Sequence, residues 1–219
     1  MKKIGILSDT HSYWDEKYLH YFEPCDEIWH AGDIGSVEVA EKLAAFRPFR
    51  AVCGNCDGGD LRLMYRELNR FKCEDVDVLI KHIGGYPGNY DFSVRSTLFA
   101  NPPQLFVAGH SHILKVKYDK TLGLLHINPG AAGLQGWHKE RTLIRLTIEG
   151  KVFKDLEVIT LGKYMMESMQ TIGKGIMQGI NQFIDNDLQT YMPLFVIAAV
   201  LILFVLLKKG IERFKNKKI

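Results

Sequence analysis

Seven side chains of the kinds that bind metal ions stand in five short segments of the chain. They are Asp9, His11, Asp33, Asn55, His82, His110 and His112. Two of the segments hold a pair of these residues separated by one position, and in an extended loop the two side chains of such a pair point the same way. Carboxylate, amide and imidazole groups together suit divalent transition metals. The set therefore predicts a metal centre.

The chemistry that such a centre would support is the hydrolysis of a phosphate ester. Two divalent ions about 3.5–4 Å apart can supply a hydroxide at neutral pH and clamp the phosphoryl oxygens. One carboxylate has to bridge the ions, because only a carboxylate donates an oxygen to each ion while cancelling charge. Asp33 and Asn55 each follow a glycine, where the backbone can turn sharply.

Short apolar runs, typical of buried strands, precede these residues. The predicted strands are residues 3–7, 27–30, 49–53, 76–82, 105–108, 124–127 and 141–148, and the predicted helices are residues 36–46 and 60–69. Strands that alternate with helices predict an α/β layered domain. The polar residues lie at or just beyond the strand ends, where ligand sites of open α/β sheets are found.

The ordered motifs D-x-H, G-D, G-N-x-D, H and G-H-x-H resemble those of the calcineurin-like metallophosphoesterase superfamily. Within it, the chain is similar to the small YfcE-type phosphodiesterase branch, from Lys2 to about Gly162, including the turn Asn128-Pro129-Gly130. The resemblance implies a four-layer α/β-β/α sandwich. It also implies a phosphodiesterase in which a metal-bridging hydroxide attacks phosphorus in line with the leaving group.

The resemblance also distributes the ligands between two ions. The first ion would take Asp9, His11, Asp33 and His112, and the second would take Asp33, Asn55, His82 and His110, with Asp33 bridging. The catalytic residues implied are Asp33, Asn55 and His82. Manganese is the ion implied for this branch, and the mixed nitrogen and oxygen ligands would also accept iron, nickel or zinc.

The chain departs from the family pattern at two positions. Many members have G-N-H-[DE], where the histidine protonates the leaving group, and here that position is Cys56. A thiol is a poorer acid for this task, so Cys56 favours substrates with good leaving groups and leaves the general acid unassigned. Where relatives commonly have H-G-H, this chain has His82-Ile83-Gly84. The contact made by the second histidine of those relatives is therefore absent here.

Three further residues are predicted to support the ligands: His30, Cys56 and Asp57. His30 is interpreted as a partner of a ligand or a satisfied core histidine, and Asp57 either orients Asn55 or an imidazole, or is a turn residue. Cys53 and Cys56 also match C-x-x-C, a pattern of redox dithiols and zinc knuckles. Because no second pair exists, two buried thiols beside a metal site is the favoured interpretation.

The alternative function comes from the same fold. The retromer scaffold subunit resembles these enzymes, yet it serves as a protein-binding module with an impaired metal site. Every ligand position carried over to this chain holds a residue that can bind metal, which favours the enzyme. The expected partner is a phosphoester substrate, and the resemblance favours a diester over a monoester.

Charge and composition limit the other classes of function. Residues 208–219 carry a net charge of +5, which leaves about −2 for the remainder of a chain whose total is +3. A mildly acidic body argues against binding nucleic acid through a broad basic face. The N-terminal apolar run is too short for a signal peptide. We therefore expect a cytoplasmic domain whose four cysteines form no disulfides.

The C-terminal quarter differs in character from the rest. We predict a metallophosphoesterase domain over residues 1–162, an amphipathic helical linker over 163–190, and a hydrophobic segment with a basic tail over 191–219. As a helix, residues 191–207 would rise only about 22–26 Å, against a hydrocarbon core of about 30 Å. The prediction is a short transmembrane helix or shallow membrane anchor, and the alternative is a buried helix.

Overall fold

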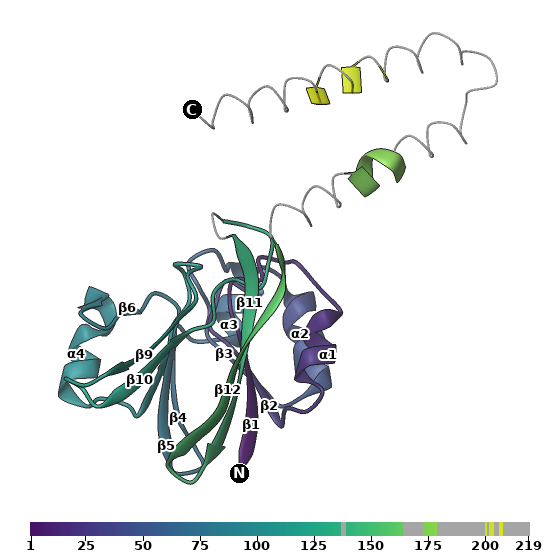
Figure 1. The fold of residues 1–219 in the computed structure, drawn as a ribbon. Helices are drawn as coiled ribbons and strands as arrows, with labels where there is room; N and C mark the ends of the chain where they lie inside the picture. The colour runs from purple at the N-terminus through teal and green to yellow at the C-terminus, as the bar shows by residue number, and fades with distance from the viewer. Residues whose placement is uncertain (137–138, 164–172, 179–199, 201, 204–205, 208–219) are drawn as a thin grey trace, which may run out of the picture. The chain divides into compact units, whose positions relative to one another are not determined.

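A computed structural model describes residues 1–136, 139–163, 173–178, 200, 202–203 and 206–207 of the 219-residue chain. The chain divides into two compact units, Met1–Ser168 and Met169–Ile219. Every strand and helix labelled in Figure 1 belongs to the first unit. In the second unit, residues 173–178 are helical. The predicted boundary after residue 162 stays a prediction.

Two five-stranded sheets form the centre of the first unit. The order across the first sheet is β12 (Val152–Lys163), β11 (Glu140–Glu149), β1 (Lys2–Leu7), β2 (Glu27–His30) and β3 (Phe49–Ala51). The order across the second sheet is β4 (Leu68–Cys73), β5 (Val76–Lys81), β8 (Leu105–Val107), β10 (Leu124–Asn128) and β9 (Lys115–Asp119). Strands β1, β2 and β3 are parallel, as are β5, β8 and β10.

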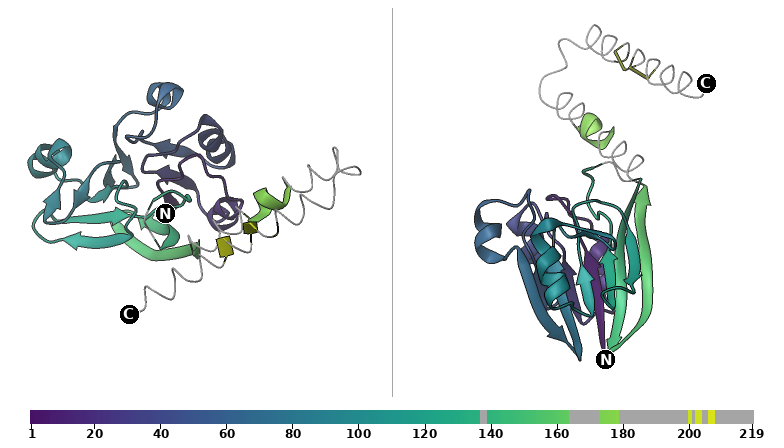
Figure 2. Two further views of the ribbon diagram at one scale, coloured as in Figure 1. Left: turned by 90° about the horizontal axis from the view of Figure 1, so that it is seen from above. Right: turned by 90° about the vertical axis from the view of Figure 1, so that its left-hand side faces the viewer.

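The helices cover the outer faces of the two sheets. They are α1 (Lys17–Phe22), α2 (Val37–Phe46), α3 (Gly59–Met64) and α4 (Phe92–Ala100), and a two-stranded hairpin of β6 (Gly85–Tyr86) and β7 (Asn89–Tyr90) precedes α4. Helices α1 and α2 lie against the first sheet and α4 against the second (Figure 1, Figure 2). Ser36 caps α2 by accepting the N–H of Val39, which marks where this helix begins.

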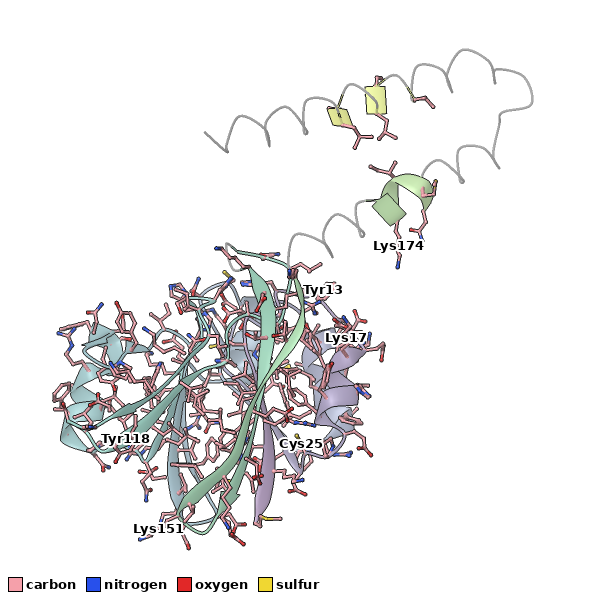
Figure 3. All side chains as sticks on the ribbon, viewed as in Figure 1. Tyr13, Lys17, Cys25, Tyr118, Lys151 and Lys174 are labelled. Atoms are coloured by element: carbon pink, nitrogen blue, oxygen red, sulfur yellow. The ribbon has the colours of Figure 1, made fainter. Side chains whose placement is uncertain are left out.

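Strand residues alternate between separate hydrophobic layers. In β1, Ile6 lies in the core between the sheets, whereas Leu7 lies in the layer under α1 and α2. In β5, Val78 and Ile80 face the core between the sheets, and Leu79 faces α4. Successive strand side chains point to opposite faces, so side chains fill the space on both faces of each sheet (Figure 3). The predicted four-layer α/β-β/α sandwich is confirmed.

Gly5 marks a close approach of β1 to α1. A Cβ atom at Gly5 would lie 2.4 Å from Cδ1 of the buried Phe22 ring. We expect Gly5→Ala to lower the free energy of unfolding by about 1–3 kcal/mol, the usual cost of overpacking a core, in a urea titration. Gly58→Ala is the control, because a Cβ there would meet nothing within 4 Å. An equal loss in both variants would contradict the packing explanation.

The predicted helix over residues 60–69 is wrong beyond Met64. Helix α3 ends there, and Leu68–Cys73 forms β4, paired antiparallel with β5 along its whole length. Pairing with β5 outweighs the weak helical preference of this stretch, because the strand backbone gains a ladder of hydrogen bonds along the edge of the second sheet. Strand β9 and helix α4 were not predicted.

The prediction of a transmembrane helix, and with it the membrane association, is corrected. No helix among the residues that the structure describes is long and apolar enough to cross a membrane. The unbroken apolar run of residues 193–207 is shorter than the roughly 20 residues that a spanning helix needs. Most of residues 191–207, and most of the predicted linker over 163–190, lie outside the described residues.

Candidate metal centre

All seven predicted ligands lie on loops at the carboxyl ends of parallel strands. Asp9 and His11 follow β1, Asp33 follows β2, Asn55 follows β3, His82 follows β5, and His110 and His112 follow β8. The first three strands belong to one sheet and the other two to the second. Both sheets therefore deliver ligands to a shared edge of the sandwich.

One group of ligand atoms consists of Asp9, His11 and His112. The Nε2 atom of His112 lies 3.1 Å from Oδ1 of Asp9 and 3.3 Å from Nε2 of His11. Two neighbouring ligands bound to one ion at about 2.1 Å are themselves about 3 Å apart. The spacing of this group suits a single ion.

A second group consists of Asp33, His82 and His110. Here Nε2 of His82 lies 3.2 Å from Oδ2 of Asp33, and the rings of His82 and His110 are 5.3 Å apart between centroids. The same Oδ2 atom of Asp33 is 3.9 Å from Nε2 of His11, which belongs to the first group. Asp33 is thus placed between the two groups, and Asp9 has a similar position, with its Oδ1 3.9 Å from Nε2 of His82.

Asn55 and Cys56 form the exposed side of the cluster. The N–H of Cys56 donates to Oδ1 of Asp33 at 2.8 Å, and Nδ2 of Asn55 donates to Sγ of Cys56 at 3.4 Å. The Cys56 thiol also belongs to a third group of ligand atoms with His11 and Asp33. Cys53 is buried and Cys56 is exposed, both as free thiols, so the expectation of two buried thiols is wrong for Cys56.

Two buried atoms of the cluster have no hydrogen-bond partner, namely Oδ1 of Asp9 and Nε2 of His82. His82 donates from Nδ1 to the carbonyl of Ala31 at 2.7 Å, so the neutral ring directs the Nε2 lone pair toward Asp33. Burial alone lowers the pKa of His82, but Asp33 and Asp9 raise it above its ordinary value. The site attracts a positive species, and a divalent ion fits these atoms.

Five predicted ligands have left-handed backbone conformations. Their φ angles are 56° at Asp9, 47° at His11, 54° at Asp33, 67° at His110 and 57° at His112. Among the described non-glycine residues, only Ser12, Glu74 and Asp155 share a positive φ. Each such residue costs about 1–3 kcal/mol and persists only where the surrounding structure enforces it. Backbone strain is therefore concentrated at this cluster.

Asp57 joins the loop after β2 to the loop after β3. Its carboxylate accepts the backbone N–H groups of Ile34 at 3.2 Å, Gly35 at 2.7 Å and Gly54 at 2.8 Å. Gly54 packs directly on Asp33, because a Cβ at Gly54 would lie 2.0 Å from Oδ1 of Asp33. Asp57 thus holds the backbone on both sides of the Asp33 carboxylate.

His30 lies behind the ligands and uses both ring nitrogens. Its Nδ1 accepts the N–H of Gly32 at 3.1 Å, and its Nε2 lies 3.0 Å from Oγ1 of Thr10. The Thr10 hydroxyl donates in turn to the carbonyl of Ile34 at 2.9 Å. Burial lowers the pKa of His30 to about 4, so the ring is neutral at neutral pH. His30 links loops and leaves no nitrogen for an ion.

The supporting roles of two further residues, Arg62 and Asn128, were not predicted from the sequence, although Asn128 stands in a turn that the family resemblance includes. Arg62 donates to the carbonyls of Asp57 at 2.7 Å and Gly54 at 3.1 Å. Asn128 donates to the carbonyl of Gly109 at 2.8 Å and so braces the loop after β8. The position of Asn128 at a strand end before Pro-Gly was a usable signal. Arg62, an arginine on a surface helix, gave no such signal in the sequence.

Comparison with known proteins agrees with this geometry. The model of the calcineurin-like phosphoesterase superfamily domain matches residues 1–151, and the chain belongs to this superfamily. A curated relative, a probable metallophosphoesterase of Methanothermobacter thermautotrophicus, is 26% identical over 171 residues, which cover 76% of this chain and 96% of the relative. Membership and the ligand groups together support a phosphoesterase that binds divalent metal.

Solved structures share the fold. A novel archaeal phosphodiesterase superposes with a TM-score of 0.59 at 23% identity, covering 73% of this chain and 99% of that one. Wild-type Vps29 from Entamoeba histolytica, complexed with Zn²⁺, gives a TM-score of 0.57 at 14% identity, covering 74% of this chain and 99% of that one. At these identities the likeness establishes the fold alone.

Removal of metal is expected to destabilise the first unit. Without an ion, Oδ1 of Asp9 and Nε2 of His82 stay buried without a partner. At a free Mn²⁺ concentration about 100 times Kd, binding adds about 2.7 kcal/mol to the free energy of unfolding. Thermal unfolding in EDTA should therefore occur at a lower temperature than in Mn²⁺. Identical curves under both conditions would contradict a metal site in this cluster.

Proposed function

We propose that this protein is a dinuclear metal-dependent phosphodiesterase with manganese as its ion. The observation that carries the proposal is the position of Asp33, whose carboxylate lies 3.2 Å from His82 in one ligand group and 3.9 Å from His11 in the other. A carboxylate placed between two groups of ligands is what a pair of bridged ions requires.

The ligand assignment is the one that the family resemblance implies, and the groups of candidate ligand atoms support its aspartate and histidine positions. Asp9, His11, Asp33 and His112 would hold one ion, and Asp33, Asn55, His82 and His110 the other. When bound, two such ions supply a nucleophile at neutral pH and neutralise the phosphoryl oxygens. The protein's part is to fix the ligands before the ions arrive. The bond from His82 to the Ala31 carbonyl, for example, keeps Nε2 free for the metal.

Among the described residues, the Cys56 position offers the leaving group no strong acid. Hydrolysis forms a bond from phosphorus to the oxygen of water and breaks the bond to the leaving oxygen, which then needs a proton. Burial and the neighbouring Asp33 carboxylate raise the pKa of the Cys56 thiol, so it is a weak acid. Aryl phosphodiesters, whose leaving groups need little protonation, are therefore the preferred test substrates.

Replacement of Cys56 by histidine should extend the substrate range. A histidine there would place a better acid beside Asp33, so we expect Cys56→His to speed hydrolysis of methyl phenyl phosphate by about 10²-fold, the lower end of the range for general acids. Hydrolysis of bis(4-nitrophenyl) phosphate, whose leaving group is good, should change much less. Initial rates on both esters measure this. Equal acceleration of both would contradict the role given to this position.

The proposal is tested by a screen of metals against substrates. Full-length protein is assayed with Mn²⁺, Fe²⁺, Ni²⁺ or Zn²⁺ on bis(4-nitrophenyl) phosphate, a diester, and on 4-nitrophenyl phosphate, the matched monoester. We expect metal-dependent hydrolysis, fastest with Mn²⁺ and with higher kcat/KM for the diester. Faster hydrolysis of the monoester would contradict the diester preference.

The alternative is a non-catalytic scaffold of the same fold, a fold that this chain shares with Vps29 structures. The zinc-bound Vps29 indicates that metal binding alone does not separate the two functions. Hydrolysis does. Protein that cleaves neither ester in the screen, whether or not it binds metal, would lead us to adopt the scaffold function, with a protein as its partner.

A further inference from the structure

A pocket of about 310 Å³ opens beside the ligands assigned to the second ion. Asn55 and His82 line its metal end, and the rest of its lining includes Arg62 of α3, Glu67 before β4, Lys81 of β5 and Asp91 before α4. The His11 and His112 side of the cluster does not contribute to it. A group attached to a phosphate on the second ion would have room here.

Most of the charge in this pocket is already engaged. Glu67 accepts from Nη1 of Arg62 at 3.1 Å, and Arg62 also donates from Nε and Nη2 to the backbone carbonyls of Asp57 and Gly54. Asp91 caps α4, accepting the N–H and the hydroxyl of Ser93 at 2.8 and 2.6 Å. Within the described residues, no hydrogen bond or ion pair engages the Lys81 ammonium group. Lys81, whose charge also acts on the Asp91 carboxylate, is therefore the lining cation available to a ligand.

The strand geometry places Lys81 apart from the ligand atoms. Val78 and Ile80 face the core between the sheets, and Leu79 faces α4. Because strand side chains alternate, Lys81 shares the α4 face, whereas His82 turns to the opposite face and bonds Ala31 of the first sheet. The ammonium is thus suited to a group beyond the reacting phosphate.

We propose that Lys81 determines specificity, and that the substrate is a phosphodiester whose ester group in this pocket carries a further anion, a carboxylate or a phosphate. This inference rests on the proposed function. The anion pairs with Lys81 in a partly desolvated pocket, where an opposite charge strengthens binding and selects among partners. Diesters without that anion leave the ammonium unpaired.

The test is direct binding to the full chain loaded with Mn²⁺. Two probes of equal shape, methyl 3-carboxypropyl phosphate and methyl 3-carbamoylpropyl phosphate, differ only in the terminal charge, and their poor alkyl leaving groups keep hydrolysis slow during the titration. We expect calorimetry to give a Kd about tenfold lower for the carboxylate, equivalent to about 1.4 kcal/mol. In Lys81→Ala the two Kd values should become equal because the carboxylate probe binds more weakly. Lys81→Arg should keep the preference for the carboxylate probe.

Lys72→Ala is the matched control, since Lys72 is an exposed lysine of the same sheet on β4, outside the pocket. It should retain the full preference. The role of Lys81 would be wrong, and the proposed function would stand, in either of two cases. One is equal Kd values for the two probes in a wild type that hydrolyses bis(4-nitrophenyl) phosphate, and the other is a preference that survives Lys81→Ala. A wild type that hydrolyses no diester would overturn the proposed function and the substrate class with it.

Discussion

Asp33→Asn is expected to lower kcat for bis(4-nitrophenyl) phosphate by at least about 10²–10³-fold, the range for loss of one preorganised electrostatic group. An amide has one oxygen for a metal and no charge, so it cannot serve both ligand groups. Burial alone raises the pKa of Asp33, but His82 and the Cys56 N–H lower it below the usual range. The native side chain is therefore a full carboxylate at neutral pH.

Asp60→Asn is the matched control for this variant. Asp60 is an exposed aspartate in the first turn of α3 and takes no part in the cluster. Steady-state assays with saturating Mn²⁺ should show wild-type rates for Asp60→Asn and almost none for Asp33→Asn. Wild-type activity in Asp33→Asn would rule out its bridging role.

Asp57→Ala is expected to lower both metal affinity and stability. The N–H groups of Ile34, Gly35 and Gly54 would lose their acceptor. Those of Ile34 and Gly54 are buried, and each buried donor left unsatisfied costs about 1–3 kcal/mol. Because Gly54 packs on Asp33, the ligand loop should loosen too. We expect Kd for Mn²⁺ to rise about 10–100-fold, as when other partners of metal ligands are removed.

A turn residue of the same type provides the comparison for Asp57. Asp75 lies exposed in the turn between β4 and β5, so Asp75→Ala should leave Mn²⁺ affinity unchanged. Titration calorimetry gives Kd, and urea unfolding gives the stability of each variant. If Asp57→Ala behaved like Asp75→Ala, Asp57 would be an ordinary turn residue.

The site was more predictable from sequence than the details of the fold around it. Pairs such as Asp9 and His11 are local, and the short apolar runs before them locate strand ends, so the ligand edge follows from nearby residues. The support given by Asp57 and Arg62 is not local in this way. It depends on how the loops after β2 and β3 pack against each other, which spacing alone does not encode.

The errors have a common physical origin in long-range contacts. The helical pattern over residues 60–69 gave no sign that Leu68–Cys73 would complete an edge of the second sheet. The pocket beside Lys81 likewise needs α3 and α4 brought together by two different sheets. In the C-terminal region, apolar composition suggested a membrane span although the run was short for one.

The number of metal ions bound per chain tests the central claim most directly. Full-length protein is stripped with EDTA, reloaded with Mn²⁺, desalted, and measured by inductively coupled plasma mass spectrometry against the protein concentration. The ligand groups that meet at Asp33 predict two ions per chain. A wild type that holds one ion or none at saturating Mn²⁺ would contradict the dinuclear centre.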